Sequence, residues 1–588
     1  MAETHIHPER ADRWQRVASL AELQLDEGKV VHVNGQTLAL FSHQGKVYAV
    51  DNRCPHMGFP LHQGSVKDGV LTCHWHHARF DLTCGGTFDL WADDVQGYPV
   101  EVRGEGAEAD IWIDSELPER DQKAYYRKRL EAGLKYNLRL VTAKAIIGLL
   151  KSGGTPEDAL RIGAEFGTLY ARNGWGAGLT VLTAMANILP HLSSTDRPRA
   201  LYQGLTFVAR ECAGQPPRFP IEPLETQERN PETLQRWFRE FVERRDNEGA
   251  ERILCTAIQI GLPQERIADM IFAACTDHLY RDVGHPLDFA NKAFELLDLT
   301  GWESAGIVLT SLLGRLIPSS RMEESASWRH PIDLADLLWK AFPKLPTALA
   351  EGAATGENWS GQEELADQLL KGEPTDTVEA MLNALRYGAT IHELAETVTY
   401  SAGRRIAQFH VTNEFGDWDT VLHTFTYANA VQQALRRAPS MELLRGVFDS
   451  AMSIYLDRFL NTPATPLPSA KGTSIQLPND LLALLNGQQQ VNEAAQLVAD
   501  GMDAGVLDAV LLSAIGQCLL REDPDFHTFQ CVEAAFRQYT ALRGTEWGRH
   551  LLIASARYLA AHSPTPRAMG QTYQIAHRLQ RGDELYEE

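Results

Sequence analysis

The feature that most constrains the fold is a change of hydrophobic pattern between residues 115 and 120. Before it, apolar and polar residues alternate in short runs rich in β-branched and aromatic side chains, which read KVVHV, QTLALFS, KVYAVDN, GVLTCHW, RFDL, YPVEVRG and DIWID. Turn-forming pairs such as Asn-Gly and Asp-Gly separate these runs, as they do in antiparallel hairpins. After it, apolar residues recur every three or four positions, which is typical of helices.

The chain is therefore predicted to be an α+β multidomain protein. We expect an N-terminal extension over residues 1–17, a small all-β domain over residues 18–115 and a large all-α body over residues 120–588. The chain has 588 residues, several times the usual length of one domain, and this length agrees with more than one folding unit.

Charge and cysteine content narrow the class of protein further. The net charge of -22 is spread along the chain, which argues against nucleic acid or an anionic membrane as a partner. The polar N-terminus has no apolar core like that of a signal peptide, and no apolar run is long enough to span a bilayer. A cytoplasmic protein is expected. Its eight scattered cysteines then serve as free thiols or metal ligands rather than as a disulfide framework.

Two short motifs carry the clearest chemistry in the sequence. Cys54-Pro-His56 and Cys73-His-Trp-His76 are separated by sixteen residues, and each follows a predicted strand where a turn begins. A tetrahedral zinc site is one interpretation, because zinc accepts two cysteines and two histidines. The mixed order favours another: each loop supplies one thiolate and one imidazole, so two irons can be held, one by both thiolates and one by both imidazoles.

The two motifs resemble those of the Rieske [2Fe–2S] family, whose pattern is C-x-H, a spacer of similar length and C-x-x-H. The resemblance covers residues 18–115 and implies that Cys54 and Cys73 bind one iron while His56 and His76 bind the other. The histidines left over are expected to be solvated or hydrogen-bonded loop residues, and they are His62, His74 and His77.

Departures from the family pattern bear on the reduction potential. High-potential members carry a disulfide between the two loops, and here Phe59 and Trp75 hold those positions. Those members also direct Ser and Tyr hydroxyls at the cluster sulfurs, where this chain has Ala78 and Phe80. Hydrogen bonds to sulfur stabilise the added electron, so we expect a potential near the low end of the Rieske range.

The helical body contains an internal repeat. Segments that begin near His285, His423 and His527 share the histidine and an Asn or Glu six residues later. About four helical units are predicted, starting near residues 156, 263, 389 and 505. Equivalent histidines in stacked units could converge on one centre, or each could simply cap or pack the start of a helix.

Nearby acidic and imidazole side chains favour a second metal site in this body. Imidazole and carboxylate together suit a non-haem iron, although carboxylates near helix starts are also ordinary caps. His410 and Glu414 would share one face if their segment were helical. The residues predicted for this second site are His278, Asp282, His285, His410, Glu414, His423 and His527.

Two functions remain open at this stage. In the first, the chain is an oxidoreductase whose cluster passes single electrons to an oxygen- or substrate-activating centre in the helical body, and a small molecule is the substrate. In the second, the cluster domain is a ferredoxin and the helical body is an interaction scaffold. In both, an external reductase or ferredoxin donates the electrons, because the chain has no G-x-G-x-x-G or P-loop of its own.

Other family patterns set limits on these functions. The helical body lacks the D-x-x-H-x-x-x-x-H spacing of standard Rieske oxygenases, whose catalytic domain is also not all-helical. Motifs such as LHTFTYANAV (422–431) are similar to those of questin-oxidase-like proteins, but no residue is carried over from that likeness. The resemblance to Rieske oxygenases, which assemble as trimers, makes a homo-oligomer a further expectation.

Overall fold

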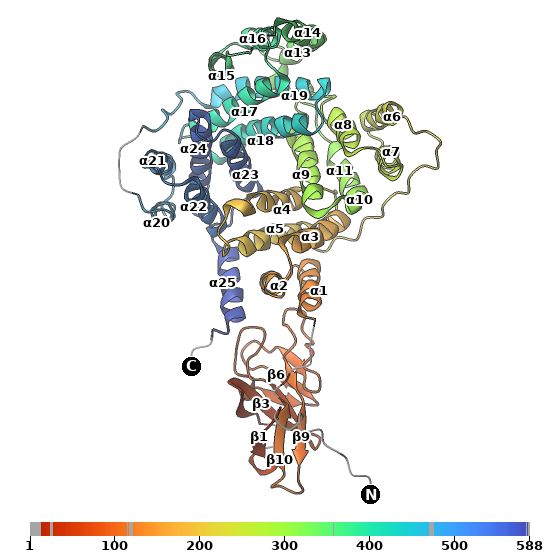
Figure 1. The fold of residues 1–588 in the computed structure, drawn as a ribbon, viewed down its shortest axis with the longest axis vertical. Coiled ribbons are helices and arrows are strands. Elements are labelled where there is room, and N and C mark those ends of the chain that lie inside the picture. Colours follow the sequence, from red (N-terminus) through yellow and green to blue (C-terminus); the bar gives the residue numbers. More distant parts are fainter. Residues whose placement is uncertain are drawn as a thin grey trace. The chain divides into compact units, whose positions relative to one another are not determined.

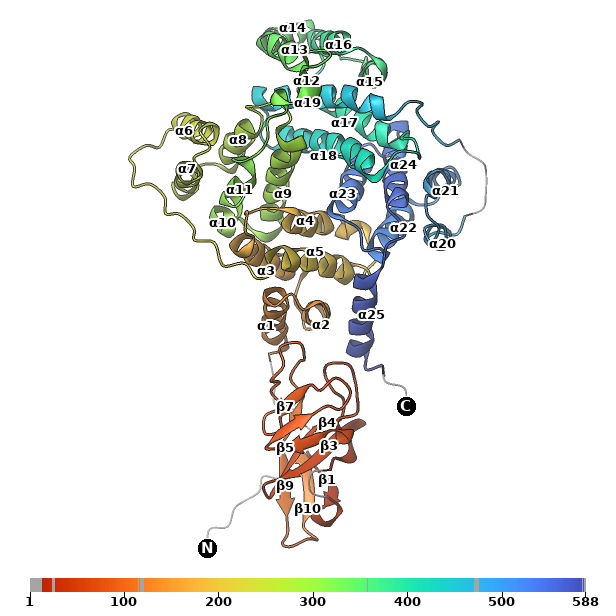
Figure 2. The ribbon, with the colours of Figure 1, turned by 180° about the vertical axis from the view of Figure 1, so that it is seen from behind.

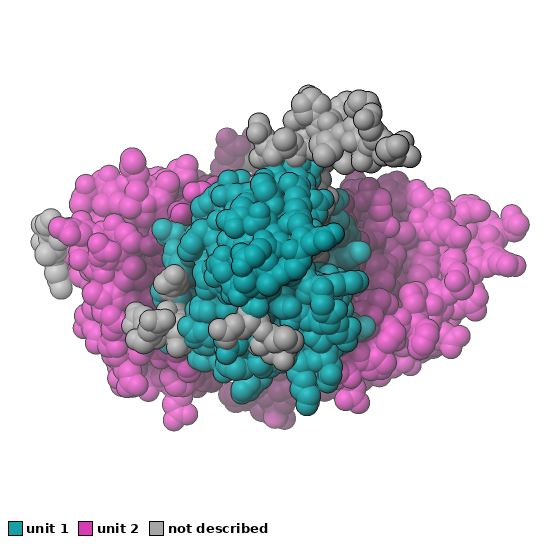
Figure 3. Space-filling view, turned by 90° about the horizontal axis from the view of Figure 1, so that it is seen from below, with its two compact units in different colours: residues 1–154, 571–588 teal, residues 155–570 magenta. Residues whose placement is uncertain are grey.

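The computed structural model describes residues 13–23, 27–114, 116, 121–356, 358–469, 475–583 and 585 (Figure 1). It divides into two compact units, which are residues 1–154 with 571–588 and residues 155–570 (Figure 3). The predicted boundary near residue 120 therefore differs from the observed division, because two helices and the C-terminal residues pack with the β domain. We describe each unit by itself.

Three antiparallel sheets form the β domain. The first has the order β1-β10-β9, the second β2-β3-β4-β8 and the third β5-β6-β7. The strands are β1 (Trp14–Ser19), β2 (Lys29–Val33), β3 (Gln36–His43), β4 (Lys46–Asp51), β5 (Ser65–Lys67), β6 (Val70–Thr72), β7 (Arg79–Asp81), β8 (Gly97–Tyr98), β9 (Val100–Arg103) and β10 (Asp110–Asp114). Since β1 pairs with β10 from Trp14 onward, the domain begins before the predicted residue 18, and part of the predicted extension is a strand.

The hairpins form where the sequence places its turn pairs. Asn34 and Gly35 join β2 to β3 with φ of 48° and 81°, and Asp68 and Gly69 join β5 to β6 with φ of 53° and 81°. Two central residues with positive φ match the right-handed twist of the strands, which is why Asn-Gly and Asp-Gly favour such turns. The pleated strands bury two separate apolar clusters, and one of them contains Cys54 and Cys73.

The same unit contains α1 (Gln122–Lys135) and α2 (Arg139–Lys151), and the end of α25 (Ala568–Arg581). Asp121 caps α1 by accepting from the backbone N–H of Ala124 at 2.9 Å. Arg53 in the β domain donates to the carbonyl of Leu579 at 3.0 Å, which ties the C-terminal helix to the β domain.

Within the described residues of the second unit, every secondary-structure element is a helix. Its helices are α3 (Pro156–Tyr170), α4 (Ala177–Ile188), α5 (Arg197–Cys212), α6 (Pro231–Glu243), α7 (Asn247–Gln259), α8 (Gln264–Cys275), α9 (His285–Thr300), α10 (Ala305–Thr310), α11 (Leu313–Leu316), α12 (Ala326–Arg329), α13 (Leu334–Ala341), α14 (Leu345–Thr355), α15 (Gln362–Lys371), α16 (Pro374–Arg386), α17 (Ile391–Ala407), α18 (Phe415–Arg437), α19 (Met441–Asp457), α20 (Asn479–Leu484), α21 (Val491–Asp503), α22 (Asp508–Arg521), α23 (Phe526–Ala541) and α24 (Glu546–Ala561).

Four of these helices surround the middle of the unit. Helices α4, α9, α18 and α23 pack against one another in turn, and Figure 2 shows them inside the other helices. Helix α4 is buried over almost its whole length, as expected for a sequence that is apolar all round. The predicted fold class, an all-β domain followed by a large helical body, is confirmed. Within the described ranges, no helix combines the length and apolar content needed to cross a bilayer.

Candidate metal centres

Two loops of the β domain carry the Cys and His motifs, and they share one backbone design. The first follows β4. In it the N–H of Cys54 donates to the carbonyl of Phe59, and the N–H of Gly58 donates to the carbonyl of Cys54, both at 2.8 Å. The chain therefore turns tightly around Cys54 and projects its side chain inward.

The second loop joins β6 to β7 and repeats this pattern. The N–H of Cys73 donates to the carbonyl of Ala78 at 2.9 Å, and the N–H of His77 donates to the carbonyl of Cys73 at 3.0 Å. His77 has a φ of 62°, in the left-handed region that Gly58 occupies in the first loop with a φ of 87°. His77 thus holds a turn position in the second loop.

The side chains of the two motifs form a suitable donor set for a [2Fe–2S] cluster. The Cys54 and Cys73 residues are only 2% and 1% exposed, and the rings of His56 and His76 lie edge to face with centroids 4.9 Å apart. Within the described residues, the buried Nδ1 of His56 has no hydrogen-bond partner. A buried polar atom without a partner is costly, so an iron at this nitrogen would satisfy it. Two thiols and two imidazoles agree with the Rieske donor set.

A charged pair lies beside the first loop. The ammonium of Lys144 donates to the carbonyl of Pro55 at 3.0 Å and contacts Asp93, which Arg129 also holds at 2.7 Å. Burial and the charge of Lys144 lower the pKa of His56 to about 4. His56 is therefore neutral near pH 7, as an iron ligand must be.

The remaining histidines of the β domain have other contacts. Asn52 Oδ1 lies 3.0 Å from Nδ1 of His62, and Ser65 Oγ lies 3.0 Å from Nε2 of His74. Both agree with the prediction that these are hydrogen-bonded loop residues.

In the helical unit, His285, His423 and His527 come together although more than a hundred residues separate each from the next. They lie on α9, α18 and α23, and one nitrogen from each falls within 4.8 Å of the others. The Nε2 atoms of His423 and His527 are 3.1 Å apart, and the rings of His285 and His423 have centroids 4.7 Å apart.

One pair of nitrogens in this group is spaced as two ligands of a single metal ion would be. Two nitrogens that each lie about 2.0–2.1 Å from a metal are about 3.0–3.4 Å apart, depending on the coordination angle. The separation of the two Nε2 atoms falls in this interval. Without a metal, the same contact is a hydrogen bond between two imidazoles, one of which donates. Metal analysis distinguishes the two states.

Burial prepares two of these histidines for metal binding. The pKa of His285 is lowered to about 4, mainly by burial, and that of His423 to about 3, by burial first and by the neighbouring imidazoles second. Both rings are therefore neutral near pH 7, and the neutral imidazole is the form that binds a metal.

Two carboxylates that the sequence pattern did not single out stand behind His527. Asp525 and Asp419 place an oxygen 3.5 Å and 3.6 Å from its Nδ1. Carboxylates in this place orient the ring of a metal-binding histidine and strengthen it as a ligand. A signal for one was present in the sequence, since Asp419 precedes His423 by four residues and so shares its helix face.

The other residues predicted for this centre lie outside the three-histidine group. His278 lies 2.5 Å from Glu323 and 2.6 Å from Glu243, and His410 bonds to Thr412 at 2.8 Å. Glu414 caps the start of α18. The segment with His410 and Glu414 is not helical, so these two side chains do not share a helix face as expected. His423 is also not at a helix start, because α18 begins eight residues earlier.

The backbone before His285 is strained. Tyr280, Asp282 and Val283 have φ of 42°, 42° and 50°, followed by Gly284 at 93°. Positive φ is rare for a β-branched residue such as Val283, and such strain persists where the surrounding structure imposes it. Asp282 lies in this turn, and its charge acts to raise the pKa of the adjacent His285 against the effect of burial.

A buried polar network joins the helices that carry the histidines. Lys292 on α9 lies 2.7 Å from Glu533 on α23 and 3.0 Å from Glu295, and Asn187 on α4 donates to both carboxylates. Arg537 adds a second positive charge, 2.9 Å from Glu295. Two cations and two carboxylates balance inside this four-helix core.

Comparison with known proteins concerns the β domain. The family model of the Rieske [2Fe-2S] domain matches residues 13–99. The ferredoxin component of a naphthalene 1,2-dioxygenase system from Pseudomonas aeruginosa is 29% identical over 17% of this chain and 97% of its own length. The 3-phenylpropionate/cinnamic acid dioxygenase ferredoxin subunit of Shigella flexneri is 33% identical over 18% and 95%.

A longer relative and a solved structure match the same small share. A 4beta-methylsterol monooxygenase from Methylococcus capsulatus is 41% identical over 12% of this chain and 20% of its own length. The structure of the ferredoxin of carbazole 1,9a-dioxygenase from Nocardioides aromaticivorans is 26% identical, covers 18% of this chain and 98% of that one, and has a TM-score of 0.16. These relatives match at most 18% of the chain, so their likeness does not extend over the helical body.

Replacing the proposed cluster ligands should remove the visible spectrum of a [2Fe–2S] centre. We expect Cys54→Ser and His76→Ala to abolish it, because each deletes one of four ligands. His74→Ala is the matched control, since this side chain sits on the same loop but bonds to Ser65. Absorption and electron paramagnetic resonance of the reduced protein provide the measurement. Loss of the spectrum in the His74 variant would contradict the ligand assignment.

Removing Lys292 should destabilise the helical unit strongly. Lys292→Met leaves Glu295 and Glu533 buried with only Arg537 to compensate, so we expect a loss of about 3–5 kcal/mol. The control is Lys340→Met, because Lys340 is 72% exposed in its pair with Asp336, so its loss should leave stability almost unchanged. Denaturant unfolding followed by circular dichroism measures both. Equal losses in the two variants would contradict a structural role for the network.

Proposed function

Because the chain belongs to the Rieske [2Fe–2S] family through its N-terminal domain, we propose that it is a one-electron oxidoreductase whose helical body holds the electron acceptor. A [2Fe–2S] cluster bound by Cys54, Cys73, His56 and His76 supplies reversible one-electron chemistry. Burial of both thiols and the unpartnered Nδ1 of His56 support this donor set. The low exposure of the cysteines keeps water away from the sulfurs.

The acceptor that we propose is a non-haem iron at His285, His423 and His527. The observation that carries this proposal is the convergence of three imidazoles from three helices, with one nitrogen of each within 4.8 Å of the others. Such an iron would supply oxygen or substrate activation. The chain's own contribution is to keep His285 and His423 neutral and to orient His527 through Asp419 and Asp525.

Joining the two centres in one chain favours electron transfer between them. A tether keeps the donor domain at a high effective concentration near its acceptor without a separate binding step. The electrons themselves must enter from an external reductase or ferredoxin, because the sequence has no nucleotide-binding motif of its own. A small molecule is the proposed substrate, and a reducing cytoplasm is the proposed compartment.

Metal content tests the acceptor. In protein purified without oxygen, we expect two irons with acid-labile sulfide and an additional metal ion. His285→Ala, His423→Ala and His527→Ala should each remove the additional metal and leave the [2Fe–2S] spectrum whole, because each deletes a ligand of one shared site. His278→Ala is the control, since its partners are Glu243 and Glu323. Two irons only in the wild-type protein would favour a ferredoxin with a helical scaffold instead.

The reduction potential tests the description of the cluster loops. Without a hydroxyl at Ala78 or Phe80, we expect a midpoint near the low end of the Rieske range, about −150 mV. Ala78→Ser and Phe80→Tyr should each raise it, because a hydrogen bond to sulfur stabilises the reduced state. Ala92→Ser is the control, since Ala92 is equally buried in the same cluster of side chains but outside both loops. A wild-type midpoint near +300 mV would contradict this reasoning.

A further inference from the structure

A cavity of about 380 Å³ lies beside the three-histidine centre, and His423 belongs to both. Cavities of about 300–1,000 Å³ are typical of small-molecule sites. A molecule in this cavity would lie against one of the proposed metal ligands. The position therefore suits a substrate of the proposed centre better than a remote regulator.

Most of the cavity wall is apolar. The rings of Tyr280 and Trp328 line it in a nearly parallel arrangement, with centroids 6.1 Å apart and planes inclined by 25°, and Met322, Leu456 and Leu460 add aliphatic surface. Trp328 is buried, so its ring is fixed by packing. Flat aromatic and aliphatic walls select an apolar molecule, because transfer of such a molecule from water is favourable.

Two polar groups in the wall have no hydrogen-bond partner among the described residues, the hydroxyl of Ser453 and one oxygen of Asp457, and only the second is a carboxylate. Asp457, at the end of α19, lines the cavity and is 4% exposed. Within the described residues, its Oδ2 has no hydrogen-bond partner. A buried acceptor without a hydrogen bond costs about 1–3 kcal/mol of free energy. A donor on a bound molecule would remove this cost by forming the missing hydrogen bond. Burial also raises the pKa of Asp457 to about 7, although Thr424 and Arg405 act to lower it.

The strained turn before His285 also reaches the cavity. Val283, with a φ of 50°, is part of its wall, and the next residue, Gly284, allows close approach to Tyr427. A Cβ on Gly284 would lie 2.6 Å from that of Tyr427. The turn thus connects the cavity wall to His285 through consecutive residues, and strain of this kind is concentrated at functional sites.

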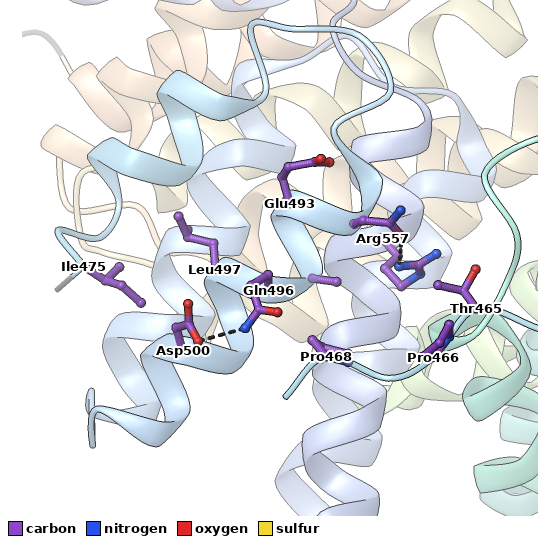
Figure 4. A pocket seen from close by; sticks show the side chains of 11 residues that line it. Thr465, Pro466, Pro468, Ile475, Glu493, Gln496, Leu497, Asp500 and Arg557 are labelled. Carbon is purple, nitrogen blue, oxygen red and sulfur yellow. Dashed lines mark hydrogen bonds between the residues drawn. The ribbon is translucent and has the colours of Figure 1, made fainter. Parts of the chain in front are cut away.

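A second cavity of similar size gives a useful contrast. It has a volume of about 400 Å³, and Figure 4 shows Gln496 bonded to Asp500 in its wall. Arg557 in the same wall donates to Asn492 at 2.8 Å and to the carbonyl of Phe409 at 2.6 Å. None of the three histidines lines it. It therefore serves as a control site.

We propose that the cavity beside His423 binds a small apolar molecule that carries one hydroxyl or N–H donor, with the donor at Asp457 and the apolar body between the aromatic walls. This inference rests on the proposed function, since it names the substrate class of the three-histidine centre. One hydrogen bond and the shape of the cavity would then position the substrate so that it contacts His423.

Two probes of matched shape test the proposal. Toluene and p-cresol differ by one hydroxyl, so p-cresol alone can donate to Asp457. We expect p-cresol to bind the full-length protein about tenfold or more tightly than toluene, as measured by calorimetry in a sealed cell. In Asp457→Leu this preference should disappear, because the acceptor is gone while the apolar walls remain. Equal affinities of the two probes for the wild-type protein would overturn the proposal.

Variants in the two cavities show which of them p-cresol occupies. Leu460→Trp should fill the cavity beside His423 and weaken p-cresol binding about tenfold or more, whereas Asn492→Leu, in the second cavity, should leave it unchanged. If Asp457→Leu fails to fold by circular dichroism, Asp457→Asn and Leu460→Trp still test the site. Loss of binding in Asn492→Leu, or none in Leu460→Trp, would place p-cresol elsewhere and overturn the proposal.

The proposal and the proposed function can fail separately. Calorimetry is repeated after chelation has removed any metal outside the [2Fe–2S] cluster. Retained selectivity for p-cresol in protein without a second metal supports the cavity assignment, even if the metal analysis excludes the acceptor. A second metal together with no selectivity for p-cresol overturns the cavity assignment and leaves the acceptor standing.

Discussion

The buried pairing of Lys292 with Glu533 and Glu295 is the interaction on which the convergence of the three histidines depends. It joins α9 to α23 in one register, because a charge buried without its partner costs several kcal/mol. Gln538 on α23 also donates to Asn429 on α18 at 2.8 Å. This hydrogen bond fixes the position of α18 relative to α23. Three helices held in this way bring their histidines to one place. If one helix shifted along another, apolar packing alone would lose less free energy than a buried charge that loses its partner.

The internal repeat acquires a physical meaning from this network. The residues six positions after the three histidines are Asn291, Asn429 and Glu533, and all three are buried and hydrogen-bonded in the four-helix core. The repeated polar residue therefore forms hydrogen bonds with neighbouring polar side chains in the core. The repeated histidine lies at the end of that core. The three segments are therefore similar in sequence because their residues occupy equivalent positions in the packing, as well as because they share a histidine.

The sequence predicts local features much better than convergent ones. Asn34-Gly35 and Asp68-Gly69 specify their own turns, so these two hairpins follow from neighbouring residues, and Cys73 comes directly after the second of them. Asp525 precedes His527 by two residues, so its place beside that histidine was open to sequence reasoning. The contact of Asp419 with His527 was missed because it joins two helices that meet only in the folded chain. The same limit explains His278 and His410. Both stand near other candidates in sequence, but their helices and loops direct them to different partners.

The cluster site and the proposed acceptor site have different structural requirements. The β domain meets the first set, and the helical body meets the second. Cys54 and Cys73 need tight turns on a small sheet that shields two thiols, and hairpins provide these with few residues. An acceptor that handles a substrate needs room beside it, and packed helices with a residual cavity provide that room at His423. The imidazoles of His285 and His423 remain neutral there because burial lowers the pKa of both. A large helical body is thus a reasonable requirement for holding both a metal and an apolar molecule, whereas a ferredoxin needs only the β domain.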